Sequence, residues 1–193
     1  MCIRDSIMPI IQLGLKPVLI DVGKSDLNIS KNNLLEIIHD LKVLFITNVL
    51  GLFSDLSEIS KICRDEGVIL LEDNCEGLGC STSKKLYGNF SLASTTSSFV
   101  GHHFSTIEGG YVFTDDDELY AMLKIVRAHG WTRDLSDYEK ELISYKVEDD
   151  FNQAYTFEYC GYNVRPSELN AYCGLVQLDQ LSFFNNIREK RFI

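Results

Sequence analysis

The sequence lacks an excess of basic residues and any long apolar run, and each absence argues against a class of protein. Lys and Arg number 18 against 28 Asp and Glu, and the formal net charge of −10 argues against general binding to nucleic acid or to anionic membranes. No apolar run approaches the roughly 20 residues of a membrane-spanning helix, and no secretory signal is evident. We therefore expect a cytoplasmic protein with no membrane partner.

Paired cysteines and metal-binding spacings are also missing. The chain has six cysteines but no C-x-x-C pair and no His/Cys spacing typical of a metal site. Reduced thiols are therefore expected, with no metal ion and no iron–sulfur cluster.

What the sequence does contain is an alternation of strand and helix patterns over 193 residues, enough for one substantial core. Three short apolar runs predict buried strands at 17–21, 43–46 and 68–71. Between them, apolar residues at helical spacing predict a helix over 31–41 and another that Ser54 or Asp55 caps and Gly67 ends. This order predicts an α/β fold with a mostly parallel sheet and helices on both faces, and ligands in such sheets bind beyond the carboxyl ends of the strands.

The second half of the chain is less regular. Residues 112–113 are expected to continue the sheet, and the acids at 115–118 open a helix that runs to about Arg127. The polar segment 131–152 has no clear period and is interpreted as a surface excursion with the character of a lid. A further helix begins near Glu168.

Both ends of the sequence look unnatural. Residues 1–6 do not join smoothly to the pattern that follows and are interpreted as a non-native lead. The chain stops inside a predicted helix. We therefore expect residues 7–193 to be a fragment.

Two acidic residues follow the third predicted strand. Asp73 stands at the carboxyl end of the run 68–71, where a carboxylate can keep a pyridinium nitrogen protonated and so make the ring an electron sink. An isolated Asp more often caps a turn. Glu76 could touch the oxygen of such a ring or simply begin a solvated loop, so the residues alone leave both choices open.

Two adjacent histidines lie in a tight loop that precedes the turn at 108–110. His102 and His103 could be ordinary surface residues, metal ligands that lack a third ligand at workable spacing, or a general base near neutral pH. Just before the loop, the hydroxyl of Ser97 could donate to a phosphate or belong to a polar strand. Asn163, ahead of the last helices, could bind an anion or brace its own loop.

Taken in order, five segments resemble the DegT/DnrJ/StrS family of nucleotide-sugar aminotransferases and dehydrases, which are fold type I pyridoxal-phosphate enzymes. The segments are Leu15–Asp21, Leu71–Gly79, the His102 loop through Gly110, Arg127–Gly130 and Gly161–Pro166. The resemblance implies that 7–193 is a partial cofactor-binding large domain with the start of the following helical region. It also implies that the small carboxyl-terminal domain is absent.

The resemblance assigns roles to individual residues. Asp73 pairs with the pyridine nitrogen of pyridoxal 5′-phosphate or pyridoxamine 5′-phosphate, and Glu76 lies beside the ring. Ser97 binds the cofactor phosphate. Asn163 reaches the phosphate of a neighbouring subunit's cofactor, which implies a homodimer.

One departure from the family pattern decides the expected reaction. The position six residues before Glu108 carries the family's cofactor-binding lysine, and here it is His102. Histidine can move protons but cannot hold the aldehyde cofactor covalently. A branch of the family with this loop removes the C3 hydroxyl of a nucleotide-linked 4-keto-6-deoxy sugar, with L-glutamate as amino donor. Deoxysugars of this kind usually enter surface polysaccharide such as the O-antigen of lipopolysaccharide.

Two other functions remain open on the sequence. The first is a nucleotide-sugar aminotransferase of the same family whose lysine comes from elsewhere in the chain. The second is a non-catalytic family member that keeps the fold without turnover.

Overall fold

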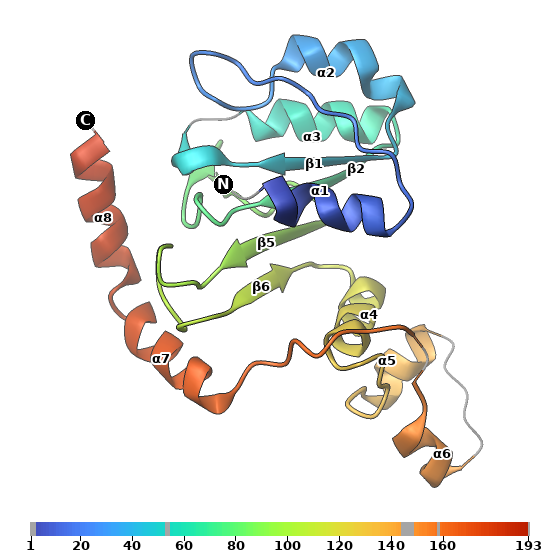
Figure 1. Cartoon of the computed structure of the whole chain (residues 1–193). Coiled ribbons are helices and arrows are strands. Elements are labelled where there is room, and N and C mark those ends of the chain that lie inside the picture. The colour runs from blue at the N-terminus through green and yellow to red at the C-terminus, as the bar shows by residue number, and fades with distance from the viewer. Residues whose placement is uncertain (1–2, 53–54, 144–148, 158, 193) are drawn as a thin grey trace. The chain divides into compact units, whose positions relative to one another are not determined.

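The computed structural model describes the chain except for residues 1–2, 53–54, 144–148, 158 and 193. It divides into two compact units, Met1–Ser97 and Ser98–Ile193, called here unit 1 and unit 2. Figure 1 traces the helices and strands of each along the chain. None of the helices in the described part of the chain combines the length and apolar character needed to cross a membrane.

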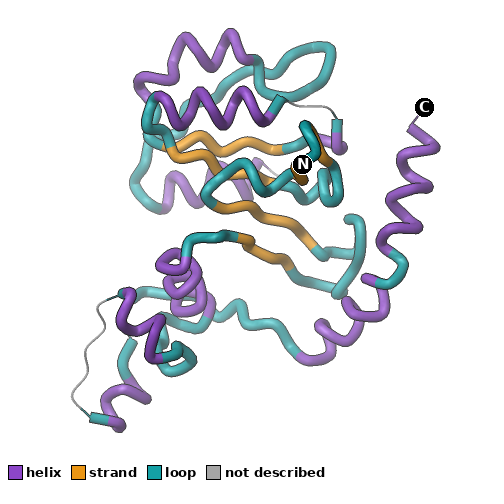
Figure 2. The backbone as a smooth tube through the Cα atoms, turned by 180° about the vertical axis from the view of Figure 1, so that it is seen from behind, coloured by secondary structure: helices purple, strands orange, loops and turns teal. Residues whose placement is uncertain are grey.

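Unit 1 contains three parallel strands whose carboxyl ends share one edge. β1 (Val43–Thr47) pairs with β2 (Ile69–Asp73), and β2 pairs with β5 (Ala93–Ser97), with Asp73 opposite Thr47 on one side and Thr95 on the other. Figure 2 shows these strands in orange with the helices of the unit beside them. The parallel pairing of these strands confirms the predicted α/β fold class. β1 and β2 also lie where the apolar runs predicted strands.

The core of unit 1 lies between this sheet and two helices. α2 (Lys31–Ile37), continued by the 3₁₀ turn η1 (Ile38–Asp40), and α3 (Leu56–Asp65) pack against one face of β1 and β2. The buried side chains alternate along the strands, as a sheet face requires. They are Leu34, Ile38, Leu44, Ile46, Leu56, Ile59, Cys63, Val68 and Leu70. The Asp55 carboxylate caps α3 by accepting from the N–H of Glu58.

The predicted strand at 17–21 is wrong. Residues 15–21 form no strand, and Leu19 is 80% exposed. An apolar run becomes a buried strand only where a neighbouring strand supplies its hydrogen bonds, and in the described part of the chain just one isolated bridge, Val22 to Ile29, forms nearby. The other elements in the described part of unit 1 are α1 (Ile3–Gln12), η2 (Val49–Gly51), β3 (Ser81–Thr82) and β4 (Lys85–Leu86).

In its described residues, unit 2 contains one strand followed by helices. They are β6 (Gly110–Phe113), α4 (Asp117–Arg127), α5 (Asp137–Leu142), α6 (Asp150–Tyr155), α7 (Glu168–Leu178) and α8 (Leu181–Phe192). Asp116 caps α4 and Ser167 caps α7, each by accepting the backbone N–H of the third residue of the helix. These helices begin close to the predicted positions, because residues typical of helix N-termini stand there in the sequence.

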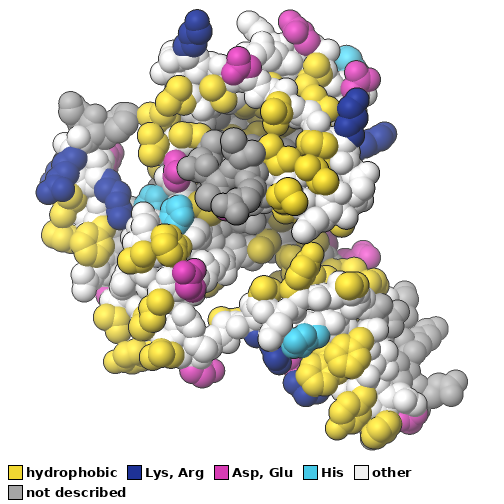
Figure 3. All heavy atoms as spheres, viewed as in Figure 1, with side chains coloured by type: hydrophobic (Ala, Val, Ile, Leu, Met, Phe, Trp, Pro, Cys, Tyr) yellow, Lys and Arg dark blue, Asp and Glu magenta, His cyan; other side chains and the backbone are white. Residues whose placement is uncertain are grey.

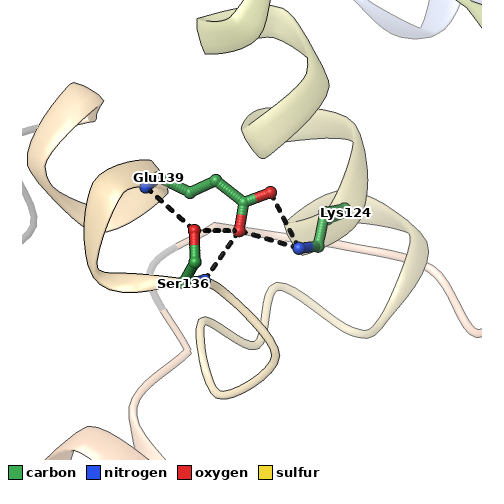
Figure 4. Close-up of polar contacts among 3 residues, drawn as sticks. All are labelled: Lys124, Ser136 and Glu139. Atoms are coloured by element: carbon green, nitrogen blue, oxygen red, sulfur yellow. Dashed lines mark hydrogen bonds and ion pairs between the residues drawn. The ribbon is translucent and has the colours of Figure 1, made fainter.

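The segment 131–152 is not the irregular excursion that its composition suggested. Leu135 is buried together with Ala121 and Ile125 of α4, and α5 packs against α4. Figure 4 shows the polar contacts beside this core: Lys124 donates to both oxygens of Glu139, and Ser136 and Glu139 form a reciprocal capping box. Charged residues obscured the pattern, because two of them serve as internal partners. Residues 144–148, where the interpretation as a lid also fell, lie outside the described part.

The predicted boundary after residue 6 stays a prediction. α1 runs from Ile3 to Gln12 without a break, so residues 3–6 are helical together with the residues that follow.

Candidate functional site

The first candidate, Asp73, is the last residue of β2 and lies at the carboxyl edge of the sheet in unit 1. Its side chain is half-buried, and its Oδ1 accepts from the N–H of Cys75 at 3.0 Å. Burial, followed by the hydrogen bond to Asp73, raises the pKa of the Cys75 thiol to about 12. The carboxylate is thus held in a defined direction by its own chain. Both the turn-capping interpretation and a ligand-binding one agree with this geometry.

Glu76 lies in the turn after β2 and contacts a strained segment. Its Oε2 accepts from the N–H of Leu50 at 2.9 Å, and Leu50 has a φ of 53°, a left-handed conformation unusual for a leucine. The structure therefore gives Glu76 a local role: it stabilises the η2 turn beside the sheet edge.

Ser97 ends β5, the strand next to β2. The two strand ends are joined beyond Asp73, where the N–H of Asn74 donates to Thr95 at 2.8 Å and the Thr96 hydroxyl donates to Asn74 at 3.3 Å. The Cys75 thiol accepts from the backbone of Ser97. The structure thus brings Asp73, Glu76 and Ser97 to one edge of unit 1.

A buried carboxylate that the sequence analysis missed supports this edge. Glu72 is fully buried, and its two oxygens accept four hydrogen bonds. The donors are Asn48 Nδ2 at 3.2 Å, the N–H groups of Gly88 at 2.8 Å and Phe90 at 3.1 Å, and the Ser91 hydroxyl at 2.9 Å. The sequence did contain one signal for this role. Glu72 lies two residues after Leu70 in β2 and so shares its buried face, where a polar side chain needs hydrogen-bond partners.

These groups match the chemistry of a pyridine-phosphate cofactor. A carboxylate such as Asp73 accepts from a protonated ring nitrogen, and a hydroxyl such as Ser97 donates to a phosphate oxygen. Both are partly exposed at the edge where parallel sheets bind their ligands. The residues present at the edge therefore fit such a group.

The histidine loop belongs to unit 2 and spans residues 98–109. A buried pair of hydroxyls, Ser98 and Thr106, closes it with their oxygens 2.5 Å apart, and the N–H of Thr106 donates to Ser98 at 2.8 Å. Gly109 is required here, because an added Cβ would lie 2.5 Å from Thr106 Oγ1 and 2.7 Å from Ser98 Oγ. The loop is therefore a closed, tightly packed turn.

His102 lies in the first half of this loop and is half-buried. Its backbone N–H donates to the carbonyl of Phe99 at 3.0 Å, and its backbone carbonyl accepts from the Arg188 guanidinium of α8 at 3.5 Å. In the described part of the chain, no group of three or more His, Cys, Asp or Glu residues is arranged to hold a metal ion.

Asn163 is exposed in the strand-like segment before α7. It forms an isolated bridge with Ala128, and the neighbouring N–H groups of Tyr162 and Val164 donate to Val126 and Arg127 at 2.7 and 3.1 Å. The backbone of this segment is thus fixed against the end of α4, while the side chain of Asn163 is exposed.

Residues 5–192 match the DegT/DnrJ/EryC1/StrS aminotransferase family. A GDP-4-keto-6-deoxy-D-mannose 3-dehydratase of Escherichia coli O55:H7 is 41% identical over 183 residues, covering 94% of this chain and 47% of that protein. Lipopolysaccharide biosynthesis protein RfbH of Salmonella typhimurium is 30% identical over 200 residues, covering 97% of this chain and 45% of that protein.

A solved structure gives the same result. GDP-4-keto-6-deoxymannose-3-dehydratase with a trapped PLP–glutamate geminal diamine superposes with a TM-score of 0.83 at 37% identity, over 94% of this chain and 47% of that one. The chain thus spans about half the length of the relatives it matches. The resemblance expected from five short segments extends over nearly the whole chain, which belongs to the DegT/DnrJ/EryC1/StrS aminotransferase family.

Proposed function

We propose that the complete protein carrying this chain is a 3-dehydratase that removes the C3 hydroxyl of a nucleotide-linked 4-keto-6-deoxyhexose. The observation that carries the proposal is His102, which stands six residues before Glu108, the position at which the resemblance places the family's lysine. Similarity to 3-dehydratases that are 37–41% identical supports it. A GDP-linked sugar is the proposed substrate, and L-glutamate the proposed amino donor.

The chemistry divides between cofactor and chain. Pyridoxamine 5′-phosphate, when bound, supplies the amino group for the sugar's 4-keto carbon and the electron sink for the reaction. Asp73 keeps the ring nitrogen protonated by accepting its N–H, and Ser97 donates its hydroxyl to the phosphate. Glu76 orients the turn beside the ring.

His102 moves the proton. The unprotonated nitrogen of its imidazole accepts the proton, and the resulting imidazolium can donate to the departing C3 hydroxyl. A primary amine would also bind the aldehyde form of the cofactor covalently, and an imidazole does not. The loop therefore favours dehydration over transamination.

We propose further that the protein is a cytoplasmic homodimer that serves the synthesis of surface polysaccharide such as lipopolysaccharide O-antigen. Exposed Asn163 is flanked by Tyr162 and Val164, which are 61% and 64% exposed. Figure 3 shows hydrophobic side chains on the visible surface of each unit. Exposed apolar groups around a polar side chain are typical of an interface, and the proposal places the phosphate of a second subunit's cofactor there.

The test uses the complete protein with pyridoxal 5′-phosphate and glutamate, scanned from about 300 to 450 nm before and after borohydride, the range in which the cofactor forms absorb. We expect conversion to the amino form without a lysine adduct, and loss of dehydration in His102→Asn. His39→Asn, which changes an exposed histidine of unit 1, serves as the matched control. His103→Asn tests the neighbouring ring.

Three results would contradict parts of the proposal. A trapped lysyl adduct would make the protein an aminotransferase. A larger loss of dehydration activity in His103→Asn than in His102→Asn would identify His103, not His102, as the base. Failure to bind the cofactor at all would identify a non-catalytic family member.

A further inference from the structure

One face of α7 lies against the second half of the histidine loop. Asn170, Gly174 and Gln177 occur at i, i+4 and i+7, the spacing that places side chains on one side of a helix. Each contacts the loop residues 105–108. In Figure 1 the loop that precedes β6 lies beside α7 and the start of α8, all within unit 2.

Asn170 acts as a hydrogen-bond donor. Its Nδ2 donates to the carbonyls of Thr106 at 2.5 Å and Glu108 at 3.2 Å. These carbonyls flank Ile107, whose φ of 71° is left-handed. The amide therefore stabilises a backbone conformation that an isoleucine adopts only at a cost.

Gln177 acts as an acceptor. Its Oε1 accepts from the N–H of Ser105 at 2.8 Å. Between Asn170 and Gln177, the helix comes so close to the loop that a Cβ on Gly174 would lie 2.8 Å from Thr106 Cγ2. Helix and loop thus fit together in van der Waals contact as well as through hydrogen bonds.

The contacts continue to His102 itself. Arg188 of α8 donates to the carbonyl of His102 at 3.5 Å. The histidine is therefore part of a loop whose backbone is bonded to two helices that lie more than 60 residues later in the chain.

We infer that Asn170 and Gln177 are positioning residues that fix the His102 loop for proton transfer, an inference that rests on the proposed function. Both amides contact the backbone of the loop. They act through the backbone at 105–108, because a base displaced by about 1 Å loses on the order of 100-fold in rate.

The two amides use opposite polarities, which allows a matched test. Gln177→Glu keeps the acceptor for Ser105, whereas Gln177→Ala removes it. Asn170→Asp keeps the shape but replaces the donor with a second acceptor facing two carbonyls. Asn186→Asp makes the same change at an exposed site on α8 and is the control for the added charge.

In the complete, cofactor-loaded protein, we expect Asn170→Asp and Gln177→Ala to lower kcat by roughly 10- to 100-fold with KM changed by less than about 3-fold. Gln177→Glu and Asn186→Asp should remain near wild type. Equal kcat in Asn170→Asp and Asn186→Asp, or equal losses in Gln177→Ala and Gln177→Glu, would overturn the inference.

Amide hydrogen exchange gives a readout that needs no turnover. The N–H of Ser105 should exchange faster in Gln177→Ala than in wild type or Gln177→Glu, and the N–H groups of Thr106 and Glu108 should exchange faster in Asn170→Asp. Unchanged exchange in both variants would refute the loop contacts. Altered exchange in a protein that lacks dehydratase activity would refute the proposed function while confirming the contacts.

Discussion

The ion pair between α4 and α5 offers a quantitative test of the packing in unit 2. Lys124 lies 2.8 Å from both oxygens of Glu139, and the side chains are only 21% and 11% exposed. The hydrogen-bonded Lys124 ammonium, with additional bonds from Ser136, lowers the pKa of Glu139 to about 2. The perturbation is Lys124→Met, which removes the cation and keeps most of the apolar stem.

The pKa shift sets the magnitude and the pH window. Relative to the ordinary glutamate value of about 4.3, a folded pKa of about 2 corresponds to about 3 kcal/mol of stability at pH 7. Because the folded pKa is lowered, this contribution is complete above the unfolded pKa and is lost as the pH falls from about 5 to about 2. Since the Ser136 bonds remain in Lys124→Met, we expect a loss of about 2 kcal/mol at neutral pH.

The assay is native-state hydrogen exchange at α5, where the N–H of Lys140 bonds to Ser136 and that of Ile143 bonds to Glu139. The opening free energy at these amides should fall in Lys124→Met at pH 7, and the difference from wild type should vanish near pH 2. Lys140→Met is the control, since its partner Asp137 is fully exposed and such pairs contribute about 0–1 kcal/mol.

Two results would refute this reasoning. One is a wild-type opening free energy at α5 that does not change between pH 6 and pH 2. The other is a Lys124→Met variant that behaves like Lys140→Met. Either would mean that the Glu139 carboxylate gains no more from Lys124 than a surface pair does.

Two further predictions concern unit 1 and the start of α4. In the cofactor-free protein at pH 8, a pKa of about 12 leaves roughly one Cys75 thiol in ten thousand ionised, so iodoacetamide should modify Cys75 far more slowly than exposed Cys160. Asp73→Asn should speed the modification of Cys75, because the Asp73 carboxylate raises the pKa of that thiol. Equal modification rates at the two cysteines would contradict the raised pKa. Asp116→Ala removes the acceptor 2.7 Å from the N–H of Leu119 and should destabilise α4 by about 1 kcal/mol, measured by exchange at its first-turn amides; protection unchanged from wild type would show that the cap is dispensable.

Local patterns in the sequence predicted the elements that depend on near neighbours. Strands β1 and β2 coincide with apolar runs. Helices α3, α4 and α7 follow directly after the capping residues Asp55, Asp116 and Ser167, whose side chains accept N–H groups three positions later. Where an element needs a distant partner, the same reasoning failed. The apolar run at 17–21 found no strand to pair with, and the polar run near 137 became a packed helix.

Local sequence patterns also located some of the candidate site residues. Asp73 could be placed at a sheet edge because parallel strands end together, and His102 was proposed as the base from its distance to Glu108 along the chain. Their roles toward cofactor and sugar remain proposals.

Residues close together in the sequence were enough to predict the family and the parallel sheet, because motifs, periodicity and helix caps are local features. The tertiary structure alone decided that Glu72 is a buried acceptor of four hydrogen bonds and that Asn170 holds the carbonyl of Thr106, 64 residues earlier. The physical reason is that burial and hydrogen-bond partners depend on which distant segments come into contact. A polar residue gives the same local signal whether it faces water or a buried backbone group.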